Sequence, residues 1–162
     1  MSETVQYVYC VLPSGVSVSG APAGLDRTAI ARVARGDLAA LVSTLDARDY
    51  SGERLSELMD DAAWLTPRAV THDSVVTWAA DLGPVVPFPM WVMFSDVSGV
   101  LDMLCREDAA LRDTLERVGG AKEFGVRLYG DQNSLAAAAL TMDAALASLE
   151  QQAAAAPPGQ AY

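Results

Sequence analysis

The residues able to do chemistry are few, and the single histidine, His72, is the first of them. Asp60, Asp61 and Asp73 lie in the same region, and carboxylates and imidazole are both metal ligands. Asp61 and His72 are separated by eleven positions, about 16 Å along a continuous helix, which is too far for one ion without a bend. We therefore predict no metal site, and a structural or exposed position for His72.

Catalytic motifs are missing from the sequence. No G-x-S-x-G nucleophile elbow accompanies the histidine, and neither G-x-x-x-x-G-K-[ST] nor G-x-G-x-x-G is there to hold phosphates. The spacing of the 21 acidic residues does not single out any pair for general acid–base catalysis. Cys10 and Cys105 are far apart, which favours two buried free thiols over a zinc site or a disulfide. The sequence predicts a protein that is not an enzyme and uses no cofactor.

The composition is that of one folded domain with an acidic surface. The chain has 162 residues, 51% of them hydrophobic, and a formal net charge of −10. Nucleic acid and anionic membrane are unfavourable partners, because binding them needs clustered basic residues and the 11 in this chain are scattered. No apolar run approaches the roughly 18 residues of a membrane span, and the first residues do not resemble a signal peptide. We expect a cytoplasmic protein.

The first third of the chain predicts three strands. Residues 4–13 are nearly continuously apolar, as in a strand inside a sheet, and residues 14–24 form a loop rich in Gly, Ser and Pro. Residues 28–36 and 38–46 flank a Gly-Asp turn, which predicts a hairpin. The alanines of the second run also permit a helix.

Helical periodicity begins at Gly52. Apolar residues recur at helical spacing as far as Leu82, and Thr66 followed by Pro67 either starts a second helix or kinks a continuous one.

The second half of the chain alternates strands and helices. The apolar stretch 85–94 is predicted as a strand, and a helix is predicted from Asp96 or Ser98 as far as residue 118. Residues 123–130 read as the last strand. A final alanine-rich helix over 135–152 begins after a cap at Asn133 or Ser134.

This order of elements predicts an α+β fold, with helices packed on one face of an antiparallel or mixed sheet. No linker is long enough to separate two domains, so we expect one domain over residues 1–152 and a disordered tail over 153–162. The final helix has one narrow apolar stripe. It either docks on its own sheet or pairs with the same helix of a second copy, which would form a homodimer.

The stretch VVPFPMWVMF, residues 85–94, has no charged residue and contains Pro87 and Pro89. Prolines two positions apart place both missing N–H groups on the same side of a strand, so a neighbouring strand on that side could not complete its hydrogen bonds. This predicts an edge strand or a bulged one. In one interpretation, alternate side chains point into the core: Phe88, Met90, Val92 and Phe94. Trp91 and Met93 then lie on the other face beneath a helix. In the other interpretation, Trp91 and Met93 form an exposed apolar patch that binds a protein partner.

Five segments occur together in an order and spacing that one known family shares. They are YVYCVLP, GDLAALVS, WLTPRAVTHDSVV, the stretch at 85–94 and KEFGVRLY, and they extend from about residue 6 to about residue 130. Together they resemble the gas vesicle accessory proteins of the GvpF/GvpL type. The resemblance implies a ferredoxin-like α+β N-terminal domain and a non-enzymatic, gas vesicle associated protein that binds the hydrophobic shell protein or other accessory proteins.

The chain also departs from the pattern of that family. The family has the pattern Leu-Arg-Phe-Gly in this stretch, and this chain has Pro89 in place of the Arg and Trp91 in place of the Gly. Members of the family also usually continue into a second α+β domain. The alternative is therefore a relative recruited as a peptide- or protein-binding module in another pathway, such as a biosynthetic one. The candidate protein-binding residues are Phe88, Met90, Trp91, Met93, Trp64 and His72.

Overall fold

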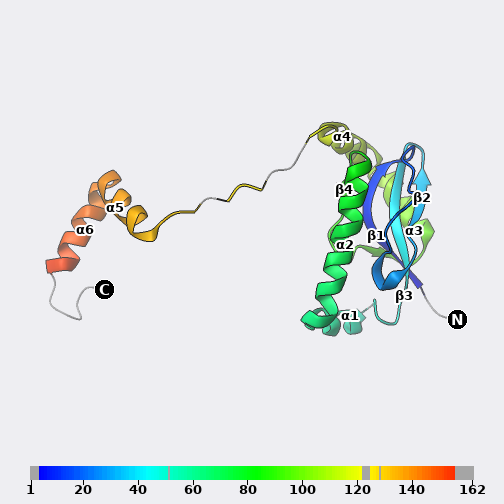
Figure 1. Ribbon diagram of the computed structural model, residues 1–162, viewed down its shortest axis with the longest axis horizontal. Helices are drawn as coiled ribbons and strands as arrows, with labels where there is room; N and C mark the ends of the chain where they lie inside the picture. Colours follow the sequence, from blue (N-terminus) through cyan, green and yellow to red (C-terminus); the bar gives the residue numbers. More distant parts are fainter. Residues whose placement is uncertain (1–3, 51, 122–124, 128, 156–162) are drawn as a thin grey trace. The chain divides into compact units, whose positions relative to one another are not determined.

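The computed structural model describes residues 4–50, 52–121, 125–127 and 129–155. The chain divides into two compact units, residues 1–122 and 123–162 (Figure 1). The first unit holds the sheet and the second holds the last two helices. The single domain expected over residues 1–152 stays a prediction.

The first unit is built on a five-stranded sheet in which every pair of strands is antiparallel. Its long central strands are β1 (Thr4–Pro13) and β3 (Leu38–Asp46), and β2 (Ala31–Arg35) forms one edge beside β3. The short strands β4 (Val86–Pro87) and β5 (Met93–Phe94) both pair with the other side of β1, so the order is β2-β3-β1-β4 with β5 also beside β1. The α+β class and the antiparallel sheet predicted from the sequence are confirmed.

The predicted hairpin is also confirmed. β2 and β3 pair from Arg35 and Leu38 next to the turn, and Gly36 in the turn has φ +57°, a left-handed conformation that Gly adopts without steric cost. Ala39 and Ala40 are completely buried, one on each face of the sheet. Alanines that permitted a helix thus serve as small side chains of a strand covered on both sides.

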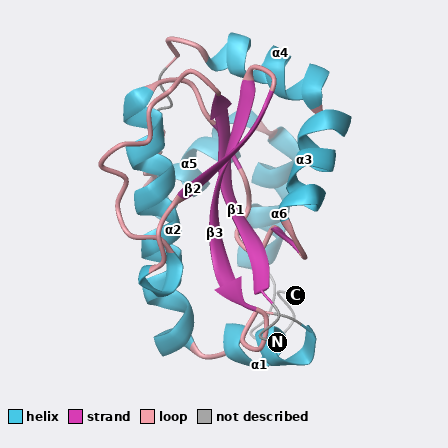
Figure 2. Cartoon of the chain, turned by 90° about the vertical axis from the view of Figure 1, so that its right-hand side faces the viewer, coloured by secondary structure: helices cyan, strands magenta, loops and turns pink. Residues whose placement is uncertain are grey.

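Helices cover both faces of this sheet, whereas the sequence predicted helices on one face (Figure 2). Helix α2 (Ala62–Leu82) packs on one face through Val75 and Ala79. Helices α3 (Val97–Arg106) and α4 (Asp108–Val118) pack on the opposite face. The reason is that β1 and β3 are apolar on both sides, and each apolar face of a sheet needs its own cover.

A bulge in β1 changes which side chains share a face. The register with β3 shifts between Val8 and Cys10, so Tyr9 and Cys10 both point to the α2 face. The hydroxyl of Tyr9 donates to Ser43 Oγ at 2.9 Å and accepts from the backbone N–H of Leu25 at 2.8 Å. This extra residue therefore anchors the loop before β2 to the sheet.

Acidic residues set several helix boundaries. Helix α1 (Gly52–Met59) ends before Asp60, and the carboxylate of Asp61 accepts from Ala63 N–H at 2.9 Å to begin α2. Pro67 therefore lies inside a continuous helix instead of starting one. Asp96 caps α3, as one of the two predicted positions, and the helix predicted as far as residue 118 is interrupted at Glu107.

The second unit contains α5 (Gln132–Met142) and α6 (Ala144–Ala155) where one helix was predicted. Asp143 separates them, because its φ of −132° and ψ of 108° are not helical and its carboxylate caps the next helix at Ala145 N–H, 2.8 Å away. The cap of α5 is Asp131, which accepts from Ser134 N–H at 2.8 Å. The docking or homodimeric pairing expected for this region stays a prediction.

Two further expectations fall partly outside the described residues. Of the strand predicted over 123–130, residues 123, 124 and 128 lie outside them, and the others are not in a strand. For the tail predicted over 153–162, the first three residues belong to α6 and residues 156–162 lie outside the described part.

Candidate protein-binding site

The uncharged stretch that holds both prolines forms an interrupted edge strand. Between β4 and β5, residues 88–92, called here the edge turn, leave the ladder with β1. The edge turn is fastened at both ends, because Phe88 N–H donates to the Tyr9 carbonyl and Val8 N–H donates to the Val92 carbonyl, each at 2.9 Å. The edge or bulged strand predicted from the prolines is confirmed.

His72, on α2, holds the edge turn from one side of the sheet. Its Nε2 lies 3.2 Å from the carbonyl oxygen of Phe88, and its Nδ1 lies 2.7 Å from the hydroxyl oxygen of Tyr7. A carbonyl can only accept, so Nε2 carries the proton and Nδ1 accepts from Tyr7. Burial lowers the pKa of His72 because the charged ring would lose its hydration. His72 is thus a buried, neutral structural group, one of the two positions expected for it.

Trp91 lies in the edge turn with a left-handed backbone, φ +72°. Its ring stacks on Trp64 with the centroids 5.4 Å apart, and it also contacts Tyr7 and Tyr50 at 6.0 and 6.2 Å. Left-handed φ favours Gly, which is the residue that the GvpF/GvpL pattern has in this register. Here the contacts of the indole offset the backbone strain. Trp91 packs against the core on the α2 face, as in the first interpretation.

Arg68 covers the outer side of this aromatic cluster. Its guanidinium carbon lies 4.1 Å from the centroid of the Trp64 ring, and its Nε donates to the hydroxyl of Tyr50 at 2.9 Å. Arg68 also forms an ion pair with Asp26, whose other carboxylate oxygen accepts from Tyr50. These bonds join Arg68, Tyr50 and Asp26 to one another beside the stacked rings, so the cluster supports the edge turn from beneath.

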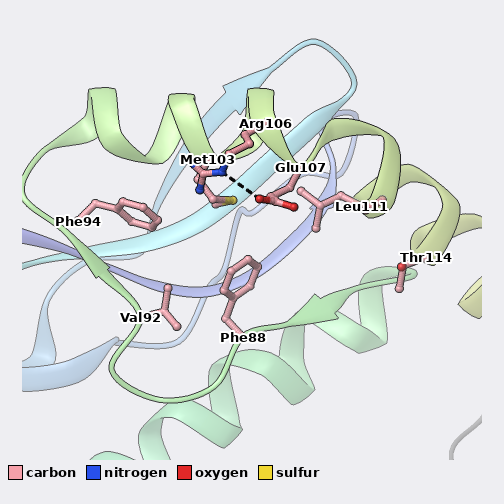
Figure 3. Close-up of a pocket in the computed structure, with 9 residues that line it drawn as sticks. Phe88, Val92, Phe94, Met103, Arg106, Glu107, Leu111 and Thr114 are labelled. Atoms are coloured by element: carbon pink, nitrogen blue, oxygen red, sulfur yellow. Dashed lines mark hydrogen bonds and ion pairs between the residues drawn. The ribbon is translucent and has the colours of Figure 1, made fainter.

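The other side of the edge turn forms one wall of an apolar pocket of about 450 Å³ (Figure 3). Six residues supply its apolar lining: Phe88, Val92, Phe94, Met103, Ala110 and Leu111. Its polar lining comes from Thr114 and from Arg106, whose Nε donates to the carboxylate of Glu107 at 3.0 Å. This mostly apolar concavity, with a few polar groups, has the size and character of a binding pocket.

The six predicted protein-binding residues do not lie in one place. Phe88 lines the apolar pocket. Met90, two positions further along the chain, is half-buried and does not line it. The others pack on the α2 face: Trp64, His72, Trp91 and Met93. The pocket wall contributed by α3 and α4 was missed. Its only signal in the sequence was the apolar periodicity of residues 96–118, which indicates a buried face but not an open concavity.

The two cysteines differ in their surroundings. Cys10 is a buried free thiol, as predicted, and burial raises its pKa to about 12. Cys105 is a free thiol as well, but the prediction that it is buried was wrong. It follows the buried Leu104 on α3, and consecutive helical residues point in directions about 100° apart.

The described residues offer neither a metal centre nor a membrane span. No three or more side chains among the His, Cys, Asp and Glu of that part are grouped so that they could hold an ion. No helix in the same part of the chain has both the length and the apolar character needed to cross a bilayer.

The fold and the pocket together define an α+β protein with a preformed apolar concavity. A family model for the gas vesicle synthesis protein GvpL/GvpF matches residues 5–162. The chain belongs to this family, and its membership supports a gas vesicle-related role.

One similar relative is gas vesicle protein L of Streptomyces sp. (strain CB03234). It is 29% identical over 138 residues, which cover 80% of this chain and 49% of the relative. The chain therefore matches about half of the length of that relative. No solved structure matches the chain.

Proposed function

We propose that this protein is a non-enzymatic gas vesicle assembly factor that binds the hydrophobic shell protein or another gas vesicle accessory protein in the cytoplasm. The match of the GvpL/GvpF family model to residues 5–162 carries this proposal. The apolar pocket supports a role in binding, because its lining offers large apolar contacts and few polar groups that could take part in a reaction.

The surface charge of the protein suits such a role. A chain with a net charge of −10 repels its own copies and stays soluble while it presents an apolar concavity. The free energy of a hydrophobic partner, in contrast, falls when its apolar surface leaves water. An acidic protein with an apolar pocket can therefore bind such a partner while the net charge of its own copies opposes their association.

The proposal is tested by affinity capture and by gene deletion in the source strain. We expect the immobilised protein to retain the shell protein encoded in the same genome, and we expect the deletion strain to form fewer gas vesicles. No retention together with normal vesicles in the deletion strain would overturn the proposal.

A second candidate function is a peptide- or protein-binding module in another pathway. Pro89 and Trp91 favour it, because they replace the Arg and Gly of the GvpF/GvpL pattern at the edge turn. The gene neighbourhood distinguishes the two functions. Shell protein genes nearby support the first, and genes for biosynthetic or modification enzymes support the second.

A further inference from the structure

We propose that the apolar pocket is the docking surface for an amphipathic helix of the protein partner. The apolar side chains of that helix would enter between the edge turn and α4, and basic residues would flank them. The class of partner rests on the proposed function. The surface itself is argued from the lining, the edge and the charges of the first unit.

The pocket has a closed apolar floor and an accessible rim. Met103 and Leu111 are buried and form part of the core on this face, whereas Phe88 is only half-buried and Ala110 is exposed. Apolar side chains of a partner would therefore meet carbon atoms on several sides. Such contacts favour binding because they remove apolar surface of both molecules from water.

The wall formed by the edge turn is held in place before any partner binds. His72 contacts the Phe88 carbonyl and the Tyr7 hydroxyl, and the ring of Tyr7 contacts the ring of Trp91 edge-on. These contacts come from the face of the sheet opposite to the pocket. Since the turn is already ordered, a partner would lose little free energy to ordering it, which is the advantage of a preorganised site.

The edge of the sheet beside the pocket is unsuitable for adding a strand. Strand addition needs a row of regularly spaced free N–H and C=O groups, but β4 and β5 have two residues each and the edge turn leaves the ladder between them. Pro87 and Pro89 also lack N–H groups. An extended peptide therefore has no ladder to join, and a helix satisfies its own backbone hydrogen bonds.

The helices that form one wall of the pocket carry more acidic than basic residues. Between residues 96 and 118 the chain has six acidic and three basic residues, of which Arg106 and Glu107 line the pocket itself. Arg106 pairs with Glu107, and Arg112 is shared by Asp108 and Asp37, so the basic groups near the α3–α4 junction are already neutralised. The excess is negative, and Lys or Arg beside the apolar face of a partner helix would complement it.

The test uses the full chain and fluorescein-labelled synthetic peptides, with binding measured by fluorescence anisotropy. The probe peptide has Leu at i, i+3, i+4 and i+7 and Lys on the rest of its surface. One control peptide has the same composition with alternating Leu, as in a strand, and a second has Glu in place of Lys. The two protein variants are Ala110→Lys, which places an ammonium group in the pocket where it repels the Lys residues of the probe, and Ala109→Lys, the matched control.

Ala109 and Ala110 are adjacent, exposed and in the same turn of α4, but only Ala110 lines the pocket. We expect Ala110→Lys to weaken binding of the probe peptide at least about tenfold, which is about 1.4 kcal/mol, and Ala109→Lys to change it less than about twofold. Circular dichroism checks that both variants fold. If Ala110→Lys does not fold, Thr114→Lys on the next turn replaces it in the comparison with Ala109→Lys.

The docking surface is overturned if the probe peptide does not bind, if it binds the pocket variant as tightly as the unchanged protein, or if the two variants lose affinity equally. It is also overturned if either control peptide binds as tightly as the probe. Because this assay uses synthetic peptides in place of the shell protein or an accessory protein, its outcome is separate from that of the proposed function. Peptide binding at the pocket, with no capture of the shell protein and normal vesicles in the deletion strain, would contradict the proposed function alone.

Discussion

Trp91 should show an unusual order of stability among its variants, because its large ring stabilises a backbone conformation that suits glycine. Trp91→Ala removes the stacking on Trp64 and the contacts with Tyr7 and Tyr50. Truncation of a buried Trp to Ala costs 3–5 kcal/mol, and since Trp91 is half-buried we expect about 3 kcal/mol. Trp91→Gly loses the same contacts, but at φ +72° Gly avoids about 1 kcal/mol of strain that Ala keeps.

The assay is equilibrium unfolding in urea. The free energies of unfolding are compared between variants whose m-values, the slopes of free energy against urea concentration, are equal. We expect the order unchanged protein, Trp91→Gly and Trp91→Ala, from most to least stable. Ala110→Gly in α4 is the control, because Gly in an ordinary helix should cost about 1 kcal/mol relative to Ala. If the Gly variant at position 91 proved less stable than the Ala variant, the left-handed conformation would not be the reason that glycine suits this position.

Three other predictions concern the α2 face. Burial lowers the pKa of His72 below the 6.5 of an unfolded chain, so the unfolded state binds the proton first. The free energy of unfolding should therefore fall as the pH drops through about 6.5, and in His72→Gln, measured by urea unfolding across this range, the fall should be smaller. Gly24→Ala should destabilise the protein by about 2 kcal/mol in the same assay, because the added Cβ would lie 2.3 Å from Ser43 Oγ. Arg68→Lys should lower the thermal midpoint, since Lys cannot both cover the Trp64 ring and keep the forked hydrogen bonds of the guanidinium.

Local signals in the sequence were sufficient for the hairpin and for most helices. Gly36 indicates a turn because glycine adopts a left-handed conformation without strain. Asp96 indicates a helix start because its carboxylate can accept from a backbone N–H of the first turn, here that of Gly99. The breaks at Glu107 and Asp143 were missed, because apolar spacing continued across them and gave no sign of a change of direction. Periodicity indicates which side of a helix is buried, but it does not say where one helix ends and the next begins.

The candidate site was predicted only in part, for a physical reason. The sequence identified the edge character of the stretch from Pro87 and Pro89, which is a local property of the backbone. One of its two interpretations placed Phe88 and Trp91 on opposite faces, as the structure does, but the pattern alone could not choose between that and an exposed Trp91. The pocket needs α3 and α4 as its second wall, and contacts between distant segments leave no pattern in one sequence.

The bulge in β1 has a consequence for changes in chain length. Losing or gaining one residue within a strand ordinarily sends every following side chain to the wrong face. Without Tyr9, the side chains of β1 would instead alternate perfectly, with Tyr7, Cys10 and Leu12 on the α2 face and Val8 and Val11 on the other. Tyr9 is thus one residue more than the ladder requires. Deleting its codon would remove the Tyr9 ring and its hydrogen bonds to Ser43 and Leu25, but it would keep the rest of the strand in phase. This point of β1 therefore tolerates a deletion better than the rest of the strand does.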